Sequence, residues 1–175
     1  MRWQPVTTGR SGAIVSRGRD VFRKATTDPT EDLRAEADRL VWLGAQGIPV
    51  PEVLEADRTF LLTRAVSGRT AADPWPAEAR PRVVEALARV TLDLHAVRLD
   101  DCPFDRRLTV SIPEALEAPV DLADLDPQRR GWSRERLVAE LLSHRPQDED
   151  LVVCHGDLCL PNVLIDPDSF AVTGV

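Results

Sequence analysis

The chain has 175 residues, of which 43% are hydrophobic and 29% are charged, with four Trp, four Phe and no Tyr. This composition is typical of a folded globular protein and excludes a disordered chain. The formal net charge of -7 argues against nucleic acid as a partner and suits a cationic ligand, although many ordinary proteins are equally acidic. Three cysteines without a C-x-x-C pair indicate neither a disulfide framework nor a zinc site. With no apolar leader and no stretch long enough to span a membrane, we expect a cytoplasmic protein without a membrane partner.

The N-terminal part of the chain predicts a small sheet with one helix. Residues 1–28 mix short apolar runs with turn residues, which favours short antiparallel strands. Residues 30–46 predict an amphipathic helix with Thr30 as a suitable N-cap, because four apolar residues share one stripe: Leu33, Ala37, Leu40 and Val41. The apolar run at residues 60–62 then predicts a buried strand.

A stretch rich in Gly and Pro at residues 66–76 suggests a boundary between two units. We therefore predict an N-terminal lobe at residues 1–65 and a mainly helical lobe at residues 66–175. Helical spacing of apolar residues indicates a long helix before Val97 and another that starts at Ser133. The last 25 residues read as an apolar strand, a polar loop, and two more short strands.

The polar loop near the C-terminus carries the strongest chemical signal. In its sequence HGDLCLPN, Asp157 precedes Asn162 by five positions, which is the spacing of the catalytic loop of protein kinases. There the Asp accepts a proton from the attacking hydroxyl, and the Asn binds a Mg²⁺ on the phosphates. Taken alone, the pattern favours an ordinary Asx turn followed by a Pro-Asn bend, because it constrains only two positions.

Upstream residues occur in the order that a kinase requires. Lys24 ends a short strand-like run and Glu36 lies in the helix that follows, which matches the pairing of a phosphate-binding lysine with a helix glutamate. A turn containing Gly9, Ser11 and Gly12 precedes them, and its backbone N–H groups are suited to phosphate. Alone, Glu36 would be read as a solvated helix residue.

Together these segments resemble a known family. HGDLCLPN preceded by VVC, and the segment LHAVRLDDCPFDRRL, are similar to the motifs of aminoglycoside O-phosphotransferases, most of all the streptomycin 3''-phosphotransferases. The resemblance extends over nearly the whole chain. It implies an α+β, bilobal, protein-kinase-like fold that is truncated in the C-terminal lobe.

The resemblance also implies roles for individual residues. Asp157 matches the catalytic aspartate, and Asn162 matches a ligand of Mg²⁺. ATP would be held by residues of the N-terminal lobe: Ser11 and Gly12 in the nucleotide-positioning loop, Lys24 and its partner Glu36, and the hinge from Thr63 to Ala65, whose backbone would receive adenine.

The function implied for the complete protein is ATP-dependent phosphorylation of an aminoglycoside hydroxyl, with streptomycin favoured, which gives antibiotic resistance. One alternative is another small-molecule kinase of the same fold, acting on choline or homoserine. Family members carry a metal-binding Ile-Asp-x-Gly segment after a strand like AVTGV, and the sequence ends at Val175. A second alternative is therefore an inactive fragment that at most binds nucleotide, and we expect no turnover from these 175 residues alone.

Overall fold

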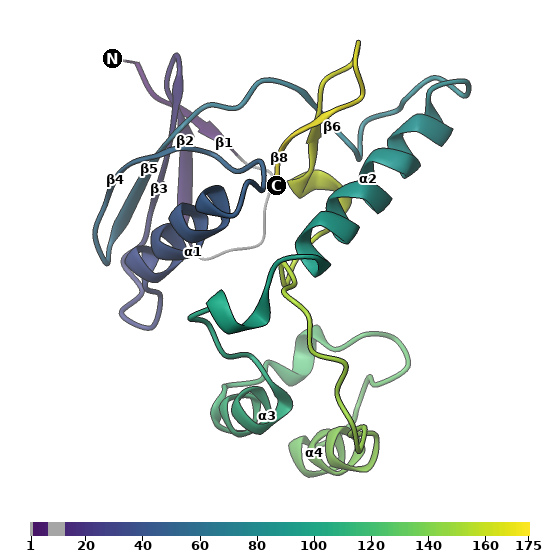
Figure 1. Ribbon diagram of the computed structural model, residues 1–175. Coiled ribbons are helices and arrows are strands. Elements are labelled where there is room, and N and C mark those ends of the chain that lie inside the picture. The colour runs from purple at the N-terminus through teal and green to yellow at the C-terminus, as the bar shows by residue number, and fades with distance from the viewer. Residues whose placement is uncertain (1, 7–12) are drawn as a thin grey trace. The chain divides into compact units, whose positions relative to one another are not determined.

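The computed structural model describes residues 2–6 and 13–175 (Figure 1). Two compact units are present, one formed by residues 1–97 together with 153–175 and the other by residues 98–152. The boundary between residues 65 and 66, expected from the sequence, stays a prediction. Within the described ranges no helix is both long and apolar enough to cross a membrane.

The first unit contains a five-stranded sheet in which every neighbouring pair is antiparallel, as predicted. The strand order is β1-β2-β3-β5-β4. The strands are β1 (Gln4–Val6), β2 (Ile14–Arg17), β3 (Val21–Ala25), β4 (Val53–Ala56) and β5 (Phe60–Arg64).

A single helix, α1 (Leu33–Ala45), packs on this sheet (Figure 1). Leu33 and Ala37 on the helix form a buried cluster with Leu61 of β5. Val41, which the periodicity placed on the same stripe, is 60% exposed, so that part of the prediction is wrong. Leu43, two residues further along the helix, is buried instead.

The N-cap of α1 also differs from the prediction. The carboxylate of Asp32 accepts hydrogen bonds from the backbone N–H groups of Arg34 and Ala35 at 3.1 and 3.2 Å. The hydroxyl of Thr30 instead donates to Asp28 at 2.7 Å, within the preceding turn. Because Asp28 already holds Thr30, the helix starts two residues later than the sequence suggested.

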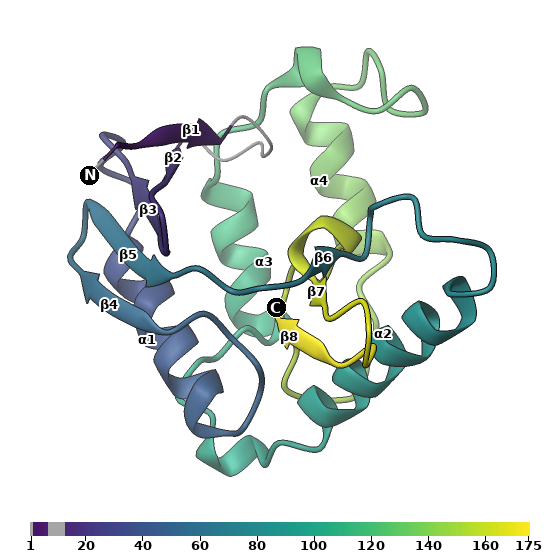
Figure 2. The same ribbon diagram turned by 90° about the horizontal axis from the view of Figure 1, so that it is seen from above.

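A second, three-stranded sheet in the same unit has the order β6-β7-β8 (Figure 2). Its strands are β6 (Arg69–Thr70), β7 (Leu164–Ile165) and β8 (Val172–Gly174). The strand expected at residues 151–154 does not form; there, only Val153 is buried. β6, from the Gly- and Pro-rich stretch, pairs with β7 instead.

Aromatic and arginine side chains join the turn between β7 and β8 to helix α2 (Arg80–His95) and to the segment before it. Trp75 is 5% exposed, and its ring lies 5.6 Å from that of Phe170 in the turn. The guanidinium of Arg82 on α2 lies 3.9 Å from the centre of the Phe170 ring. These cation–π and aromatic contacts fix the hairpin that follows the polar loop.

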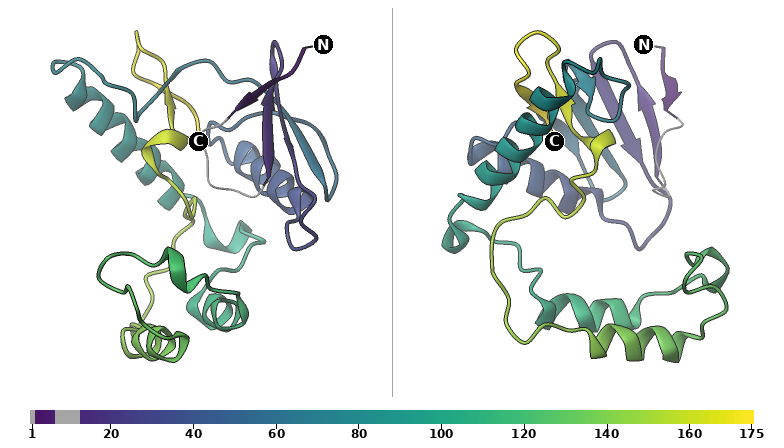
Figure 3. Two further views of the ribbon diagram at one scale, coloured as in Figure 1. Left: turned by 180° about the vertical axis from the view of Figure 1, so that it is seen from behind. Right: turned by 90° about the vertical axis from the view of Figure 1, so that its right-hand side faces the viewer.

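The second unit consists of two helices that lie side by side, α3 (Leu108–Glu117) and α4 (Arg134–Ser143) (Figure 3). Arg134 donates to the carbonyl oxygens of Leu116 and Ala118 and so joins the two helices. Ser133, where the sequence predicted the start of a helix, is the N-cap of α4, and its hydroxyl accepts from the Arg136 backbone N–H at 3.3 Å.

Replacing the N-cap of α1 tests how the helix begins. We expect Asp32→Ala to lower the free energy of unfolding by about 1 kcal/mol, because two backbone N–H groups lose their acceptor. Asp32 also lies 3.7 Å from Arg58, so Asp32→Asn, which keeps the cap and removes the charge, is the matched control. Urea unfolding of Asp32→Asn should match the wild type, and an equal loss in both variants would assign the effect to the ion pair.

Candidate active site

Lys24 and Glu36, paired in the prediction, are in contact. The Nζ of Lys24, near the end of β3, donates to the Oε2 of Glu36 on α1 at 2.7 Å. Register explains this contact, since Lys24 lies directly opposite Leu61 of β5, and Leu61 packs against α1. Side chains at opposite positions of an antiparallel pair share one face of the sheet. Lys24 therefore points to the face that α1 covers.

The polar loop brings Asp157 and Asn162 together. The Nδ2 of Asn162 donates to the backbone carbonyl and to the Oδ2 of Asp157, each at 3.0 Å. Because a carbonyl and a carboxylate can only accept, the amide nitrogen must face them. The Oδ1 of Asn162 is consequently turned outward, as an acceptor that is available to a cation.

The two residues that precede Asp157, His155 and Gly156, set its orientation. The backbone N–H of Asp157 donates to the Nδ1 of His155 at 3.3 Å, which requires the tautomer that carries its proton on Nε2. Gly156 has φ of 86°, in the left-handed region where side chains other than glycine are strained. The motif therefore needs glycine between His155 and Asp157 for the backbone to turn.

The loop is mounted on a rigid frame. Immediately after Asn162, the side chains of Val163 and Ile165 are fully buried. The carbonyl of Val163 accepts from the backbone N–H of Ala71 at 2.9 Å, next to β6. Polar side chains held this way keep their geometry without induced ordering.

The remaining predicted residues fall in different places. Ser11 and Gly12 lie outside the described residues. Thr63 is in the middle of β5, with β3 and β4 on either side of it. Ala65 follows the strand, and its N–H already donates to the carbonyl of Asp20 at 2.9 Å. An adenine contact at Ala65 would therefore use its carbonyl group.

The oxygen atoms on the loop suit a hard cation, such as Mg²⁺, that takes most of its ligands from phosphates and water. Within residues 2–6 and 13–175, no group of three or more His, Cys, Asp or Glu side chains is arranged to hold a metal ion. Mg²⁺ commonly binds through one or two protein oxygens, with phosphates and water filling the other positions. The exposed Asn162 Oδ1 and the Asp157 carboxylate, which lies beside the Asn162 amide, fit that role.

The sequence patterns missed two features of this site. The HGDLCLPN motif contains Gly156 but does not by itself predict a positive φ there; a Gly directly before the key Asp is the signal. The hydrogen bond from the Ala65 N–H to the Asp20 carbonyl has no signal in the sequence. It depends on how the turn between β2 and β3 meets the end of β5.

Comparison with known proteins places the chain in a family. Residues 3–175 match the model of the phosphotransferase enzyme family. The chain is 46% identical to an aminoglycoside 3'-phosphotransferase of Streptomyces fradiae, over 99% of this chain and 72% of the relative.

Solved structures agree. A crystal structure of an aminoglycoside 3'-phosphotransferase of type VIII superposes with a TM-score of 0.85 at 46% identity, over 99% of this chain and 70% of that one. The aminoglycoside phosphotransferase APH(3'')-Id of Streptomyces rimosus, in complex with ADP and streptomycin, gives 0.76 at 32% identity, over 98% and 68%. The expected kinase-like α+β fold with an N-terminal antiparallel sheet is confirmed.

A double-mutant cycle tests whether the pair of Lys24 and Glu36 is there for stability. The two side chains are 25% and 40% exposed, so we expect a coupling free energy below about 1 kcal/mol between Lys24→Met and Glu36→Gln. Urea unfolding of the wild type, both single variants and the double variant measures it. A coupling of about 3 kcal/mol or more would instead show a structural ion pair.

Proposed function

Because the chain belongs to the phosphotransferase enzyme family, we propose that the protein transfers the γ-phosphoryl group of ATP to a hydroxyl of an aminoglycoside, and so confers resistance. The observation that carries this proposal is the contact of Asn162 with both the carbonyl and the carboxylate of Asp157. It holds a general base and a metal-binding oxygen side by side on a rigid loop.

Asp157 acts on the substrate hydroxyl in this proposal. The hydroxyl oxygen forms the new bond to the γ-phosphorus while the bond from that phosphorus to the β,γ-bridging oxygen breaks, and ADP leaves. The proton of the hydroxyl passes to the Asp157 carboxylate. His155 keeps this carboxylate in position through the Asp157 backbone N–H.

The N-terminal sheet holds the nucleotide. Lys24 binds its phosphates, and Glu36 keeps the Lys24 side chain in place through the 2.7 Å contact. A phosphate-binding role for Ser11 and Gly12 rests on the sequence alone, because both lie outside the described residues. Mg²⁺, bound through the Asn162 oxygen, would neutralise charge on the phosphates. The APH(3'')-Id relative was solved with ADP, which supports a nucleotide at this place.

Two hydroxyl positions compete as the acceptor. The 46% identity to 3'-phosphotransferases favours a 3'-hydroxyl of the aminoglycoside. Streptomycin is the second candidate, since a streptomycin 3''-kinase of Streptomyces griseus is 40% identical to the chain and the Cys-Pro-Phe segment resembles that group. The net charge of -7 is favourable for either cationic drug.

Substitution of the base tests the proposed function. The product of the whole open reading frame that encodes this chain is assayed for ADP release with streptomycin and with an aminoglycoside that carries a 3'-hydroxyl. We expect Asp157→Asn to lower kcat by about 10²–10⁴-fold, with little change in ATP affinity, because Asp157 acts on the hydroxyl. Asp168→Asn, an exposed carboxylate of the next turn, is the control and should behave as the wild type.

Each outcome decides a part of the proposal. Turnover with one drug alone identifies the acceptor hydroxyl. Turnover with choline or homoserine and with neither drug would favour another small-molecule kinase, and nucleotide binding without any turnover would favour a binding module. Near-normal kcat in Asp157→Asn would remove Asp157 from its role.

A pair of glycines separates backbone strain from catalytic geometry. Gly156 and Gly131 have φ of 86° and 81°, and a Cβ added at either would meet no atom within 4 Å. We expect Gly156→Ala and Gly131→Ala each to cost about 1–2 kcal/mol of stability, through the left-handed backbone alone. Only Gly156→Ala should also lower kcat, by about tenfold or more, because the turn it strains orients Asp157. An equal fall in kcat for both would show a general loss of folded protein.

A further inference from the structure

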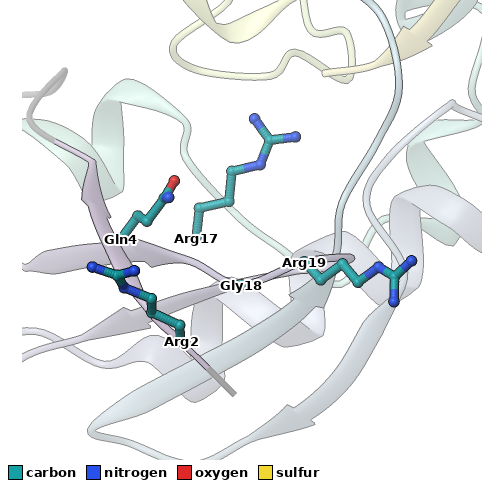
Figure 4. A pocket seen from close by; sticks show the side chains of 5 residues that line it. All are labelled: Arg2, Gln4, Arg17, Gly18 and Arg19. Carbon is teal, nitrogen blue, oxygen red and sulfur yellow. The ribbon is translucent and has the colours of Figure 1, made fainter.

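A hollow of about 410 Å³ opens at the edge of the five-stranded sheet (Figure 4). Its residues come from the start of the chain, whereas the polar loop is near the C-terminus. It is lined by Arg2, Gln4, Arg17, Gly18 and Arg19. Three of its five residues are arginines, and a fourth is an amide that can donate. None of them belongs to the catalytic or nucleotide-binding residues described above.

Strand register explains why Gln4 and Arg17 lie side by side. Gln4 of β1 lies directly opposite Arg17 of β2, so their side chains emerge on the same face of the sheet. Figure 4 shows them extending in the same direction from neighbouring strands, with Arg2 beside Gln4 and Arg19 extending away. Arg17 also lies over the ring of Phe22 on β3, 5.5 Å from its centre, which holds the long side chain in place.

The arginines of the hollow are poorly neutralised. Among the residues that the structure describes, neither Arg2 nor Arg17 has a carboxylate within 4.0 Å. Arg19 reaches Asp20 at 4.0 Å, with both side chains largely exposed, so this contact contributes little. Guanidinium groups without counter-charges attract a multivalent anion.

The sequence shows the same bias independently. Six of the 22 basic residues, but only one of the 29 acidic residues, lie in the first 25 positions. Three of these six basic residues, Arg2, Arg17 and Arg19, line the hollow. A hollow of this size suits a small anion better than a nucleic acid strand, which needs an extended basic track.

We propose that Arg2, Gln4 and Arg17 form an anion subsite that binds a phosphate group. The planar forks of the two guanidinium groups match pairs of phosphate oxygens, and the Gln4 amide adds a neutral donor between them. Lys24 lies on the same face of the sheet but is paired with Val15, two positions before Arg17 on β2, and its ammonium group is engaged by Glu36. The phosphate comes either from a free phosphate anion or from a nucleotide. The subsite does not rest on the proposed transfer reaction.

Calorimetric titration with pyrophosphate at low salt tests the subsite, because salt screens exposed charges. We expect saturable binding to the full chain and a loss of affinity of about tenfold or more in Arg2→Ala/Arg17→Ala. Arg23→Ala is the matched control, since Arg23 is an exposed arginine of β3 whose neighbours Phe22 and Lys24 point to the other face. It should bind as the wild type.

Further variants keep the test decisive. Arg17→Lys keeps the charge but not the fork, and should weaken binding without affecting folding. In an ATP titration, a parallel loss in Arg2→Ala/Arg17→Ala identifies the nucleotide as the source of the phosphate, and unchanged ATP affinity identifies a free anion.

Three results would overturn the subsite. One is the absence of saturable pyrophosphate binding to the wild type. Another is an equal loss in Arg23→Ala, which would show attraction by net charge alone. The third is binding that is abolished by Lys24→Ala and unchanged in Arg2→Ala/Arg17→Ala, which would place the pyrophosphate in the nucleotide site.

Discussion

The register of β3 against β5 is the constraint on which the N-terminal half of the molecule depends. Lys24 lies opposite Leu61, and the two side chains therefore share a face. Leu61 uses that face to bury itself against α1, while Lys24 uses it to reach Glu36 on the same helix. If β3 slipped by one residue against β5, Arg23 would replace Lys24 on this face. If β5 turned over instead, Leu61 would lose its burial against α1, which contributes about 1.5–3 kcal/mol.

The same logic explains which parts of the fold the sequence predicts. α1 and the strands around it follow from apolar periodicity, because burial against one partner decides them. The start of α1 was misplaced because Thr30 and Asp32 are both good caps in sequence, and only the turn at Asp28 decides between them. β6 was missed because its pairing with β7 spans about 95 residues and leaves no local pattern. The strand expected near Val152 was wrong, since an apolar run alone does not provide a pairing partner.

The candidate site divides along similar lines. The spacing of Asp157 and Asn162 is local, so the sequence could place both residues on one loop, and the structure shows them in contact. The pairing of Lys24 with Glu36 was anticipated from their order on a strand and the following helix. The arginine hollow was not, because Arg2 and Arg17 meet only through the register of β1 and β2, which short strands specify weakly in sequence.

The buried position of Trp75 has a spectroscopic consequence. Of the four tryptophans, Trp75 alone is buried. Its ring lies against Phe170 in the turn that follows the Asp157 loop. The chain contains no tyrosine, so no energy transfer from that residue blurs the indole emission. Tryptophan fluorescence therefore reports, without a label, whether this hairpin is packed in place. Any event that lifts the turn between β7 and β8 from α2 would move the emission of Trp75 towards longer wavelengths, without an added label.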